Sequence, residues 1–256
     1  MKNKVILISI DGMRPDGMKN CGNPYVSELE KMAAYSYTAN SVRPTVTFPC
    51  HFSMAHSVKP ERHGILTNTY VPEVRPITGL FERIRMFGGK TAMFYSWEPM
   101  RDISRPEALC FSTYINLHME ESVDTALTDE AIRVVGKYKP DFVFLYLGKT
   151  DNVGHDYGWM TKEYLERINI AIDNVKRMIE SFGEEYSVII MADHGGHDRC
   201  HGDGRPEDFT IPLFFIGQSF TPGVIIEQLT LLDIAPTVAK VMGFEPVAEW
   251  EGKAIF

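Results

Sequence analysis

Short, fully apolar runs alternate along the chain with longer stretches that carry apolar residues at helical spacing. The apolar runs are typical of strands buried on both faces of a sheet, and the clearest are 5–10, 142–147 and 188–191. Similar runs cover 91–95 and 212–216. Because such strands alternate with helices, the pattern predicts an α/β fold whose mostly parallel central sheet has helices on both faces.

The clearest predicted helix spans residues 164–182. Its apolar positions form one stripe, and Gly183 ends it; the stripe is Leu165, Ile168, Ile172, Val175, Ile179 and Phe182. Other helices are expected at 24–32, 45–54, 77–87, 123–138 and 233–242. Residues 66–74 have an irregular pattern, and the weak pattern of 99–118 predicts loops or a small insert.

Length and composition favour one domain spanning 1–256, since the chain has 256 residues, of which 44% are hydrophobic and 23% charged. The net charge is −8, and no Lys/Arg run forms a stripe, which argues against duplex nucleic acid as a partner. No apolar run is long enough to cross a membrane or to form an export signal. The 4 scattered cysteines without a CxxC are therefore expected to be reduced thiols in a cytoplasmic protein.

Potential metal ligands follow the three strongest strands. Asp11 directly follows the first strand, and Asp151 follows residues 142–147 with His155 four positions later. Asp193 and His194 follow the third strand. Because the carboxyl ends of parallel strands share one edge of a sheet, we expect these side chains to converge.

Each of these residues also has a simpler interpretation. An aspartate after a strand is most often a cap or turn residue, and a single DxxxH pair is usually solvated. The segment 194–201 is alternatively a compact structural zinc site that uses Cys200. Together, however, the clustered carboxylates and imidazoles, which continue to His197 and His201, would be costly to bring together without a compensating cation.

The ligand types and their number predict two metal ions. Asp and His suit zinc best, with manganese as the alternative, and a set this large exceeds one tetrahedral ion. Two ions about 3.5–4 Å apart form a clamp for in-line attack on phosphorus. Thr47 is the best candidate nucleophile because it precedes Pro49 at a predicted helix start, where the dipole favours an anion. Thr45 is its competitor, and simple N-capping is the alternative use of Thr47.

Five motifs, in order over nearly the whole chain, resemble the alkaline phosphatase superfamily and, within it, the nucleotide pyrophosphatase/phosphodiesterase branch. They are ISIDGMRPD, PTVTFPCHFSMAHSVKPERHGI, KTDNVGHDYG, MADHGGHDRCHG and LLDIAPTVAKVMGFEP. The resemblance implies an alkaline phosphatase-like core, two divalent metals and an attacking threonine. It assigns one ion to Asp11, Thr47, Asp193 and His194, and the other to Asp151, His155 and His201. His63 and His197 match positions that are not ligands.

One position departs from the branch. Its phosphodiesterases usually have TFPN where this chain has Thr47-Phe48-Pro49-Cys50. The asparagine would donate a hydrogen bond to a phosphate oxygen, whereas a thiol is a weak donor. We therefore expect Cys50 to contact the substrate, and its presence leaves the preference for diesters or monoesters open.

The predicted function is a two-metal phosphodiesterase or nucleotide pyrophosphatase that forms a covalent intermediate on Thr47. Its substrate is expected to be a small phosphate ester, a nucleotide being one option. A phosphomonoesterase and a phosphomutase of the same superfamily are alternatives, although such mutases usually carry a sizeable cap domain. An alternative of another class is a non-catalytic module that binds metal or ligand.

Overall fold

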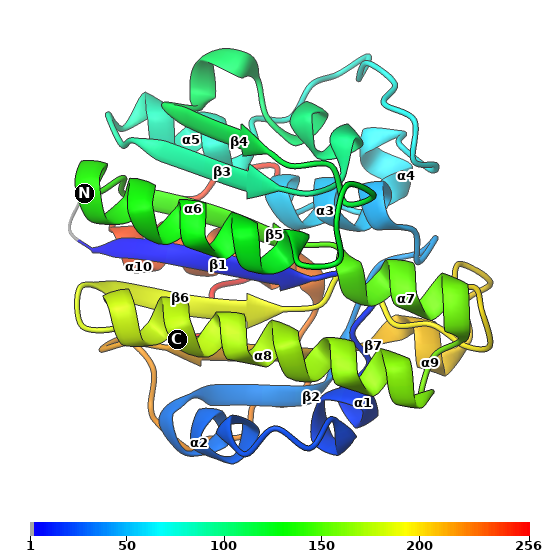
Figure 1. The fold of residues 1–256 in the computed structure, drawn as a ribbon. Coiled ribbons are helices and arrows are strands. Elements are labelled where there is room, and N and C mark those ends of the chain that lie inside the picture. The colour runs from blue at the N-terminus through cyan, green and yellow to red at the C-terminus, as the bar shows by residue number, and fades with distance from the viewer. Residues whose placement is uncertain (1–2) are drawn as a thin grey trace.

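The computed structural model describes residues 3–256 and contains one seven-stranded sheet, in the order β2-β7-β6-β1-β5-β3-β4 (Figure 1). The strands are β1 (Lys4–Ile10), β2 (Ala34–Asn40), β3 (Thr91–Tyr95), β4 (Phe111–Tyr114), β5 (Phe142–Leu147), β6 (Tyr186–Met191) and β7 (Thr210–Ile216). The central strand β1 pairs in parallel with both β5 and β6. The sheet was predicted from runs of Val, Ile, Leu and Phe, and residues 5–10 of β1 are all buried.

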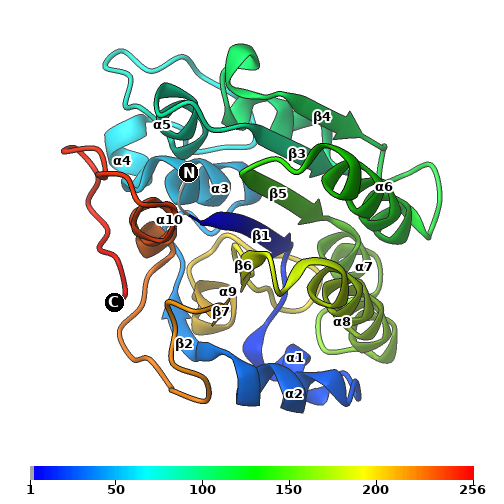
Figure 2. The ribbon, with the colours of Figure 1, turned by 90° about the vertical axis from the view of Figure 1, so that its left-hand side faces the viewer.

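Helices cover both faces of the sheet (Figure 2). One layer contains α6, α8 and the smaller α1 and α2, and the other contains α3, α5 and α10. The bounds are α1 (Pro15–Asn20), α2 (Tyr25–Met32), α3 (Thr47–His56), α4 (Pro60–His63), α5 (Leu80–Met86), α6 (Val123–Tyr138), α7 (Lys149–Tyr157), α8 (Lys162–Phe182), α9 (Pro206–Phe209) and α10 (Ile234–Met242). Short 3-10 turns are η1 (Glu98–Ile103), η2 (Pro106–Ala108) and η3 (Leu231–Asp233).

The prediction of a mostly parallel sheet is confirmed. The pairs β1–β5, β1–β6, β3–β5 and β3–β4 are parallel, whereas β7 runs antiparallel to β6 and β2. Within residues 3–256, no helix combines the length and apolar character that a bilayer crossing requires.

Two edge strands were not predicted. The weakly patterned region 99–118 contains η1, η2 and β4, and β4 pairs in parallel with β3 at one edge of the sheet. The other edge is β2, whose sequence AYSYTAN is rich in small and polar residues. Edge strands bury less apolar surface than central ones, so their hydrophobic pattern is weak.

The carboxyl ends of β5, β1 and β6 lie side by side on one edge of the sheet (Figure 1). α7 begins directly beyond β5, and the loop after β6 runs back across the same edge (Figure 1). Asp11 continues the pairing beyond β1, because its backbone N–H donates to the Leu147 carbonyl at 3.0 Å. This arrangement brings the polar residues at the ends of the three strands together.

Candidate active site

The ends of the three central strands deliver three aspartates to one buried point. Asp11 follows β1, Asp193 follows β6, and Asp151 lies in the first turn of α7 after β5. Gly12 makes this approach possible, since its φ is +67° and a Cβ there would stand 3.0 Å from the Asp151 Oδ1 atom. The Gly12 N–H donates to Asp193 Oδ1 at 3.2 Å, which links the end of β1 to the end of β6.

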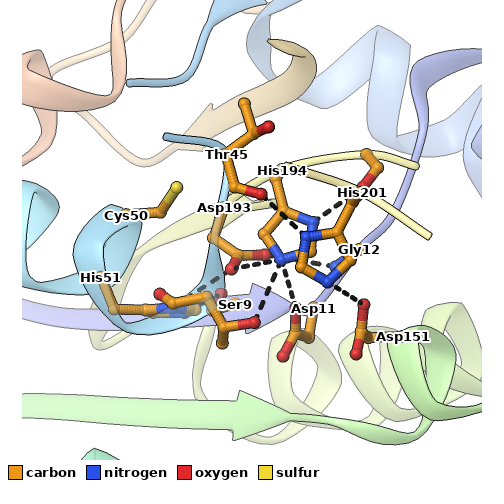
Figure 3. A network of polar contacts seen from close by, with 12 residues as sticks. Ser9, Asp11, Gly12, Thr45, Cys50, His51, Asp151, Asp193, His194 and His201 are labelled. Carbon is orange, nitrogen blue, oxygen red and sulfur yellow. Dashed lines mark hydrogen bonds and ion pairs between the residues drawn. The ribbon is translucent and has the colours of Figure 1, made fainter. Parts of the chain in front are cut away.

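A first cluster surrounds the Nε2 atom of His194. This atom lies 3.3 Å from Asp11 Oδ1 and 3.3 Å from Asp193 Oδ2 (Figure 3). Thr47 Oγ1, from the first turn of α3, is 3.1 Å from the same nitrogen. All four residues are buried. The structure thus brings together the complete set that the resemblance assigned to the ion beside the nucleophile.

A second cluster adjoins the first. His155 Nε2 lies 3.4 Å from Asp151 Oδ2, and the two residues are one turn apart on α7. His201 Nε2 is 3.6 Å from Asp151 Oδ1 and 3.1 Å from His155 Nε2. The His194 and His201 rings stack with their centroids 4.0 Å apart, so the two clusters share a wall (Figure 3).

The imidazoles of these clusters are all held in the orientation that metal ligands need. Nδ1 of His194 donates to Gly195 O at 2.7 Å, Nδ1 of His155 donates to Arg199 O at 3.0 Å, and Nδ1 of His201 donates to Thr45 O at 2.8 Å. A carbonyl oxygen can only accept, so each neutral ring keeps its proton on Nδ1 and presents a lone pair at Nε2. In both clusters an Nε2 lone pair therefore faces a carboxylate oxygen. Two acceptors that face each other in this way are suited to bind a cation between them.

The carboxylates show the same need for positive charge. Asp11 Oδ1, Asp151 Oδ1 and Asp193 Oδ2 are buried, and none has a hydrogen-bond partner within the described part of the chain. Burial raises the pKa of Asp11 well above its usual value, and repulsion from Asp193 and Asp151 raises it further. Burial, followed by repulsion from Asp151, raises the pKa of Asp193 to about 8. Orphaned acceptors are costly unless a cation binds them, so these residues fit divalent metals.

Thr47 does not serve as a helix cap. The residue at the N-cap position of α3 is Val46, and no side-chain capping bond forms there. The Thr47 hydroxyl instead contacts His194 and lines a cavity of about 240 Å³. Thr45, the competing candidate, is absent from the cavity lining, and its backbone carbonyl holds His201. The geometry therefore favours Thr47 as the nucleophile.

Two supporting residues were missed by the sequence analysis. His51, one turn after Thr47 on α3, is fully buried, with Nδ1 2.8 Å from Thr47 O and Nε2 2.8 Å from Ser9 Oγ. The Tyr146 hydroxyl donates to Asp11 Oδ2. Burial lowers the pKa of His51 to about 4, so this histidine is neutral at pH 7. The i, i+4 spacing from Thr47 and the single hydroxyl in the strand FVFLYL were the available signals.

The cavity extends from the two clusters towards the surface loops. It is lined by Asp11, Thr47, Asn68, Trp97, Leu117, His118, Tyr146, Gly148, Asp151, Asn152, His155 and His201. Asn68 had also been missed, because it lies in the irregular segment before α5. Its Oδ1 accepts the Phe48 N–H at 3.0 Å, next to Thr47. This bond orients the amide and leaves Nδ2 as a donor beside the candidate nucleophile.

The prediction that Cys50 contacts the substrate is wrong. Its side chain is 0% exposed and is not part of the cavity lining. The sulfur lies 3.4 Å from Ser41 Oγ and 3.6 Å from Pro44 O, beside the aspartate and histidine cluster rather than within it (Figure 3). Burial raises the pKa of this thiol far above its usual range. Position 50 faces the core, so its departure from the TFPN pattern does not alter the cavity.

Comparison with known families agrees with this geometry. Residues 5–207 match the family model of the type I phosphodiesterases / nucleotide pyrophosphatases. The chain belongs to this family. Among its curated relatives, human ectonucleotide pyrophosphatase/phosphodiesterase family member 1 is 25% identical over 217 residues, which is 74% of this chain and 23% of the relative. Human bis(5'-adenosyl)-triphosphatase ENPP4 is 25% identical over 215 residues, or 75% of this chain and 47% of the relative.

A second type of relative and the solved structures extend the comparison. The 2,3-bisphosphoglycerate-independent phosphoglycerate mutase of Bacteroides thetaiotaomicron is 31% identical over 134 residues, or 50% of this chain and 26% of that protein. Human ectonucleotide pyrophosphatase / phosphodiesterase 5 superposes with a TM-score of 0.82 at 13% identity, covering 98% of this chain and 97% of that one. The shared α/β fold is thus confirmed. The chain spans about a quarter of the length of the first relatives it matches.

Proposed function

We propose that the protein is a two-metal phosphoric ester hydrolase that cleaves phosphodiesters or pyrophosphates by way of a covalent intermediate on Thr47. One observation carries the proposal. The Thr47 hydroxyl lies 3.1 Å from His194 Nε2, on the cavity wall that also contains Asp11, Asp151 and His201. Phosphoryl transfer requires a nucleophile, groups that bind cations next to it, and a cavity for the substrate. The site has all three, since two adjoining clusters of carboxylates and imidazoles are suited to bind cations.

The first cluster, Asp11, Thr47, Asp193 and His194, would hold one divalent ion, and the second, Asp151, His155 and His201, would hold the other. Zinc suits these nitrogen and oxygen donors best, with manganese as the alternative. When bound, the ions neutralise the charge that develops on phosphate oxygens and lower the pKa of a hydroxyl or water. Without them, the orphaned carboxylate oxygens would repel an anionic substrate.

Thr47 performs the covalent step. Its Oγ1 loses the hydroxyl proton and forms a bond to phosphorus, while the bond from phosphorus to the leaving oxygen breaks and that oxygen is protonated. A water molecule then attacks the same phosphorus, the bond to Thr47 Oγ1 breaks, and the hydroxyl is restored. His51 keeps the first turn of α3 in place, since it bonds Thr47 O on one side and Ser9 on the other.

Asn68 is proposed to bind a non-bridging phosphate oxygen. Its Oδ1 is engaged by the Phe48 N–H, so Nδ2 is available for donation into the cavity. A donor positioned before the reaction stabilises the extra charge of the transition state without reorganisation. This role replaces the one that the sequence pattern had suggested for Cys50.

A nucleotide is the proposed substrate. The relatives are named as nucleotide pyrophosphatases and a bis(5'-adenosyl)-triphosphatase, and a structure of an inactive murine phosphodiesterase 5 contains AMP. The aromatic ring of Trp97 and the side chains of Leu117 and His118 line the outer part of the same cavity. Such a rim offers apolar and aromatic surface to a base or another leaving group.

Hydrolysis of diesters is expected to require added metal. We expect protein stripped with a chelator to be inactive on nucleotide diesters, dinucleotide polyphosphates and aryl phosphodiesters, and to recover with zinc or manganese. Chromatography of the products, which are a phosphate monoester or nucleotide and the leaving alcohol or phosphate ester, measures the outcome. A phosphomutase, which the partial match to a mutase makes the second candidate, would isomerise a monoester and release no free phosphate. Stoichiometric metal binding without turnover on any ester would contradict the proposal and favour a binding module.

Asn68→Ala is expected to lower kcat by about 10²-fold, since one positioned donor to a developing oxyanion contributes about that much. The matched variant is Cys50→Ala, which removes the side chain at the position the sequence pattern had favoured. Cys50 lies outside the cavity, so its truncation should leave kcat within about twofold while lowering stability by about 1 kcal/mol. Asn68→Asp keeps the acceptor for the Phe48 N–H, so it separates loss of the Nδ2 donor from loss of the bond to Phe48. Equal kcat values in the two alanine variants would remove Asn68 from the mechanism.

A further inference from the structure

A tight turn in the segment from His194 to His201 places a histidine and a cysteine side by side. The His197 N–H donates to Cys200 O at 2.9 Å, and the Cys200 N–H donates to His197 O at 2.9 Å. Asp198 inside the turn has a φ of 46°, which closes the chain on itself. The turn brings Cys200 Sγ to 3.2 Å from His197 Nε2.

A carboxylate from the following loop reaches the same nitrogen. Asp203 Oδ2 lies 3.3 Å from His197 Nε2, and the Arg205 Nε atom lies 3.1 Å from that carboxylate oxygen on its other side. The Arg205 N–H also donates to Asp203 Oδ1, at 3.2 Å. Arg205 thus steadies the carboxylate beside His197, and Cys200, Asp203 and Arg205 are all exposed.

Asp208 has a different role in the group. Its side chain is fully buried, and its Oδ1 lies 2.7 Å from His197 Nδ1, the length of a charge-assisted hydrogen bond. Its Oδ2 accepts the Gly202 N–H at 3.0 Å, so both oxygens have partners. A carboxylate can only accept here, which keeps the proton on Nδ1 and turns the Nε2 lone pair towards Cys200 and Asp203. A carboxylate behind a histidine in this way is typical of metal-binding histidines.

The two distances that meet at His197 Nε2 fit a shared ion. Nitrogen, oxygen and sulfur atoms bound to a tetrahedral ion at about 2.0–2.3 Å stand about 3.3–3.6 Å apart. The contacts of His197 Nε2 measure 3.2 Å to sulfur and 3.3 Å to oxygen. In the first cluster, His194 Nε2 stands at the same 3.3 Å from its two carboxylates.

We propose a third cation site, separate from the two catalytic clusters, in which His197 Nε2, Cys200 Sγ and the Asp203 carboxylate bind one zinc-class ion and solvent fills the fourth position. The site does not depend on the proposed hydrolase function. A thiolate with an imidazole selects zinc or cobalt over magnesium, calcium and manganese. On binding, the Cys200 thiol releases its proton to solvent, and no redox change is involved.

The position of the site suggests what it does. His194 and His201 come from the two ends of one segment, and His197 and Cys200 lie between them. An ion that joins the middle of this segment to Asp203 would reduce its freedom, so the site would stabilise the loop that carries ligands of both clusters. The segment would then need fewer apolar contacts to remain ordered.

Cobalt substitution can detect this site directly. The two catalytic clusters offer only nitrogen and oxygen, so a thiolate-to-cobalt charge-transfer band in the near ultraviolet would report the third site alone. We expect the full-length protein loaded with Co²⁺ to show the band, and Cys200→Ser to lose both the band and about one ion per chain. Cys110→Ser is the matched control, because Cys110 is also exposed but lies in the segment between η2 and β4.

A second variant keeps the thiol. Asp203→Asn should retain a thiolate band but weaken cobalt binding at this site by at least about 10-fold, whereas Cys110→Ser should match the wild type throughout. Circular dichroism checks that each variant is folded. The proposal is overturned if the wild type shows no thiolate band, if the band survives Cys200→Ser, or if Asp203→Asn binds cobalt as tightly as the wild type. The first of these outcomes would mean that Cys200 and His197 form only a hydrogen bond.

Discussion

Thr47→Ala is expected to lower kcat on phosphodiesters by about 10³-fold or more. The number of metal ions bound per chain should stay the same, because the first cluster loses only one of its four ligands. The variant loses the only hydroxyl among the cavity residues that contacts His194, and with it the covalent route. Hydrolysis rates measure the loss. Acid quenching of the wild type during turnover, followed by mass spectrometry, should find a phosphoryl or nucleotidyl group on Thr47.

Two further variants control this experiment. Thr47→Ser keeps a hydroxyl at the same position and should retain measurable turnover and the covalent adduct. Thr45→Ala removes the neighbouring hydroxyl, which lies outside the cavity, while the backbone carbonyl that holds His201 remains. Unchanged turnover in Thr47→Ala, or an adduct found on Thr45, would sink the covalent scheme in its present form.

Metal-free protein is expected to lose stability as pH rises from about 7 to about 8. Burial raises the pKa of Asp193 to about 8 in the folded state, whereas an unfolded aspartate ionises near pH 4. The unfolded state therefore binds fewer protons in this window, so the free energy of unfolding falls by about 1.4 kcal/mol per pH unit for this one group. Buried His194, whose pKa is lowered mainly by burial, is neutral when folded but takes up a proton near pH 6.5 when unfolded, so it opposes the trend around that pH and only weakly above about pH 7.

Asp193→Asn tests the origin of this slope. The variant cannot ionise, so the metal-free form should have a flatter pH profile and a higher melting temperature at pH 8 than metal-free wild type. Metal binding and hydrolysis should both fail in the same variant, because one carboxylate of the first cluster is gone. Asp129→Asn is the control, since the Asp129 side chain is 60% exposed and should change neither property. A wild-type slope that persists in Asp193→Asn would assign the effect to Asp11 or Asp151.

Central strands were predictable, and edge strands were not. β1, β5 and β6 are buried on both faces, so their apolar runs are continuous. Each run ends just before one of the candidate metal-binding aspartates. β7 was recognised as a strand, but its antiparallel direction depends on the long loop after His194, which carries no hydrophobic pattern. β2, with the sequence AYSYTAN, has no apolar run, and its identity depends on pairing with β7.

The active-site residues divide in the same way, because those at the ends of central strands were predictable and those on loops were not. Asp11, Asp151 and Asp193 were predictable because parallel strands must deliver their ends to one edge. Asn68 could not be found in this way, since it reaches Thr47 through an irregular loop and one hydrogen bond to Phe48. Cys50 was misplaced because its match to the asparagine of the TFPN motif does not give the direction of the side chain, which packs against Ser41.

The cavity wall has two parts, which come from different elements of the fold. Substitutions are tolerated differently in the two parts. Its inner part comes from the ends of buried central strands, where any change disturbs the core. Its outer part, which includes Trp97, Leu117 and His118, comes from segments that lie outside those strands. Exchanging the segments that carry Trp97 and Leu117 would therefore change which leaving groups the cavity accepts, while Thr47, Asn68 and the two clusters keep the chemistry constant.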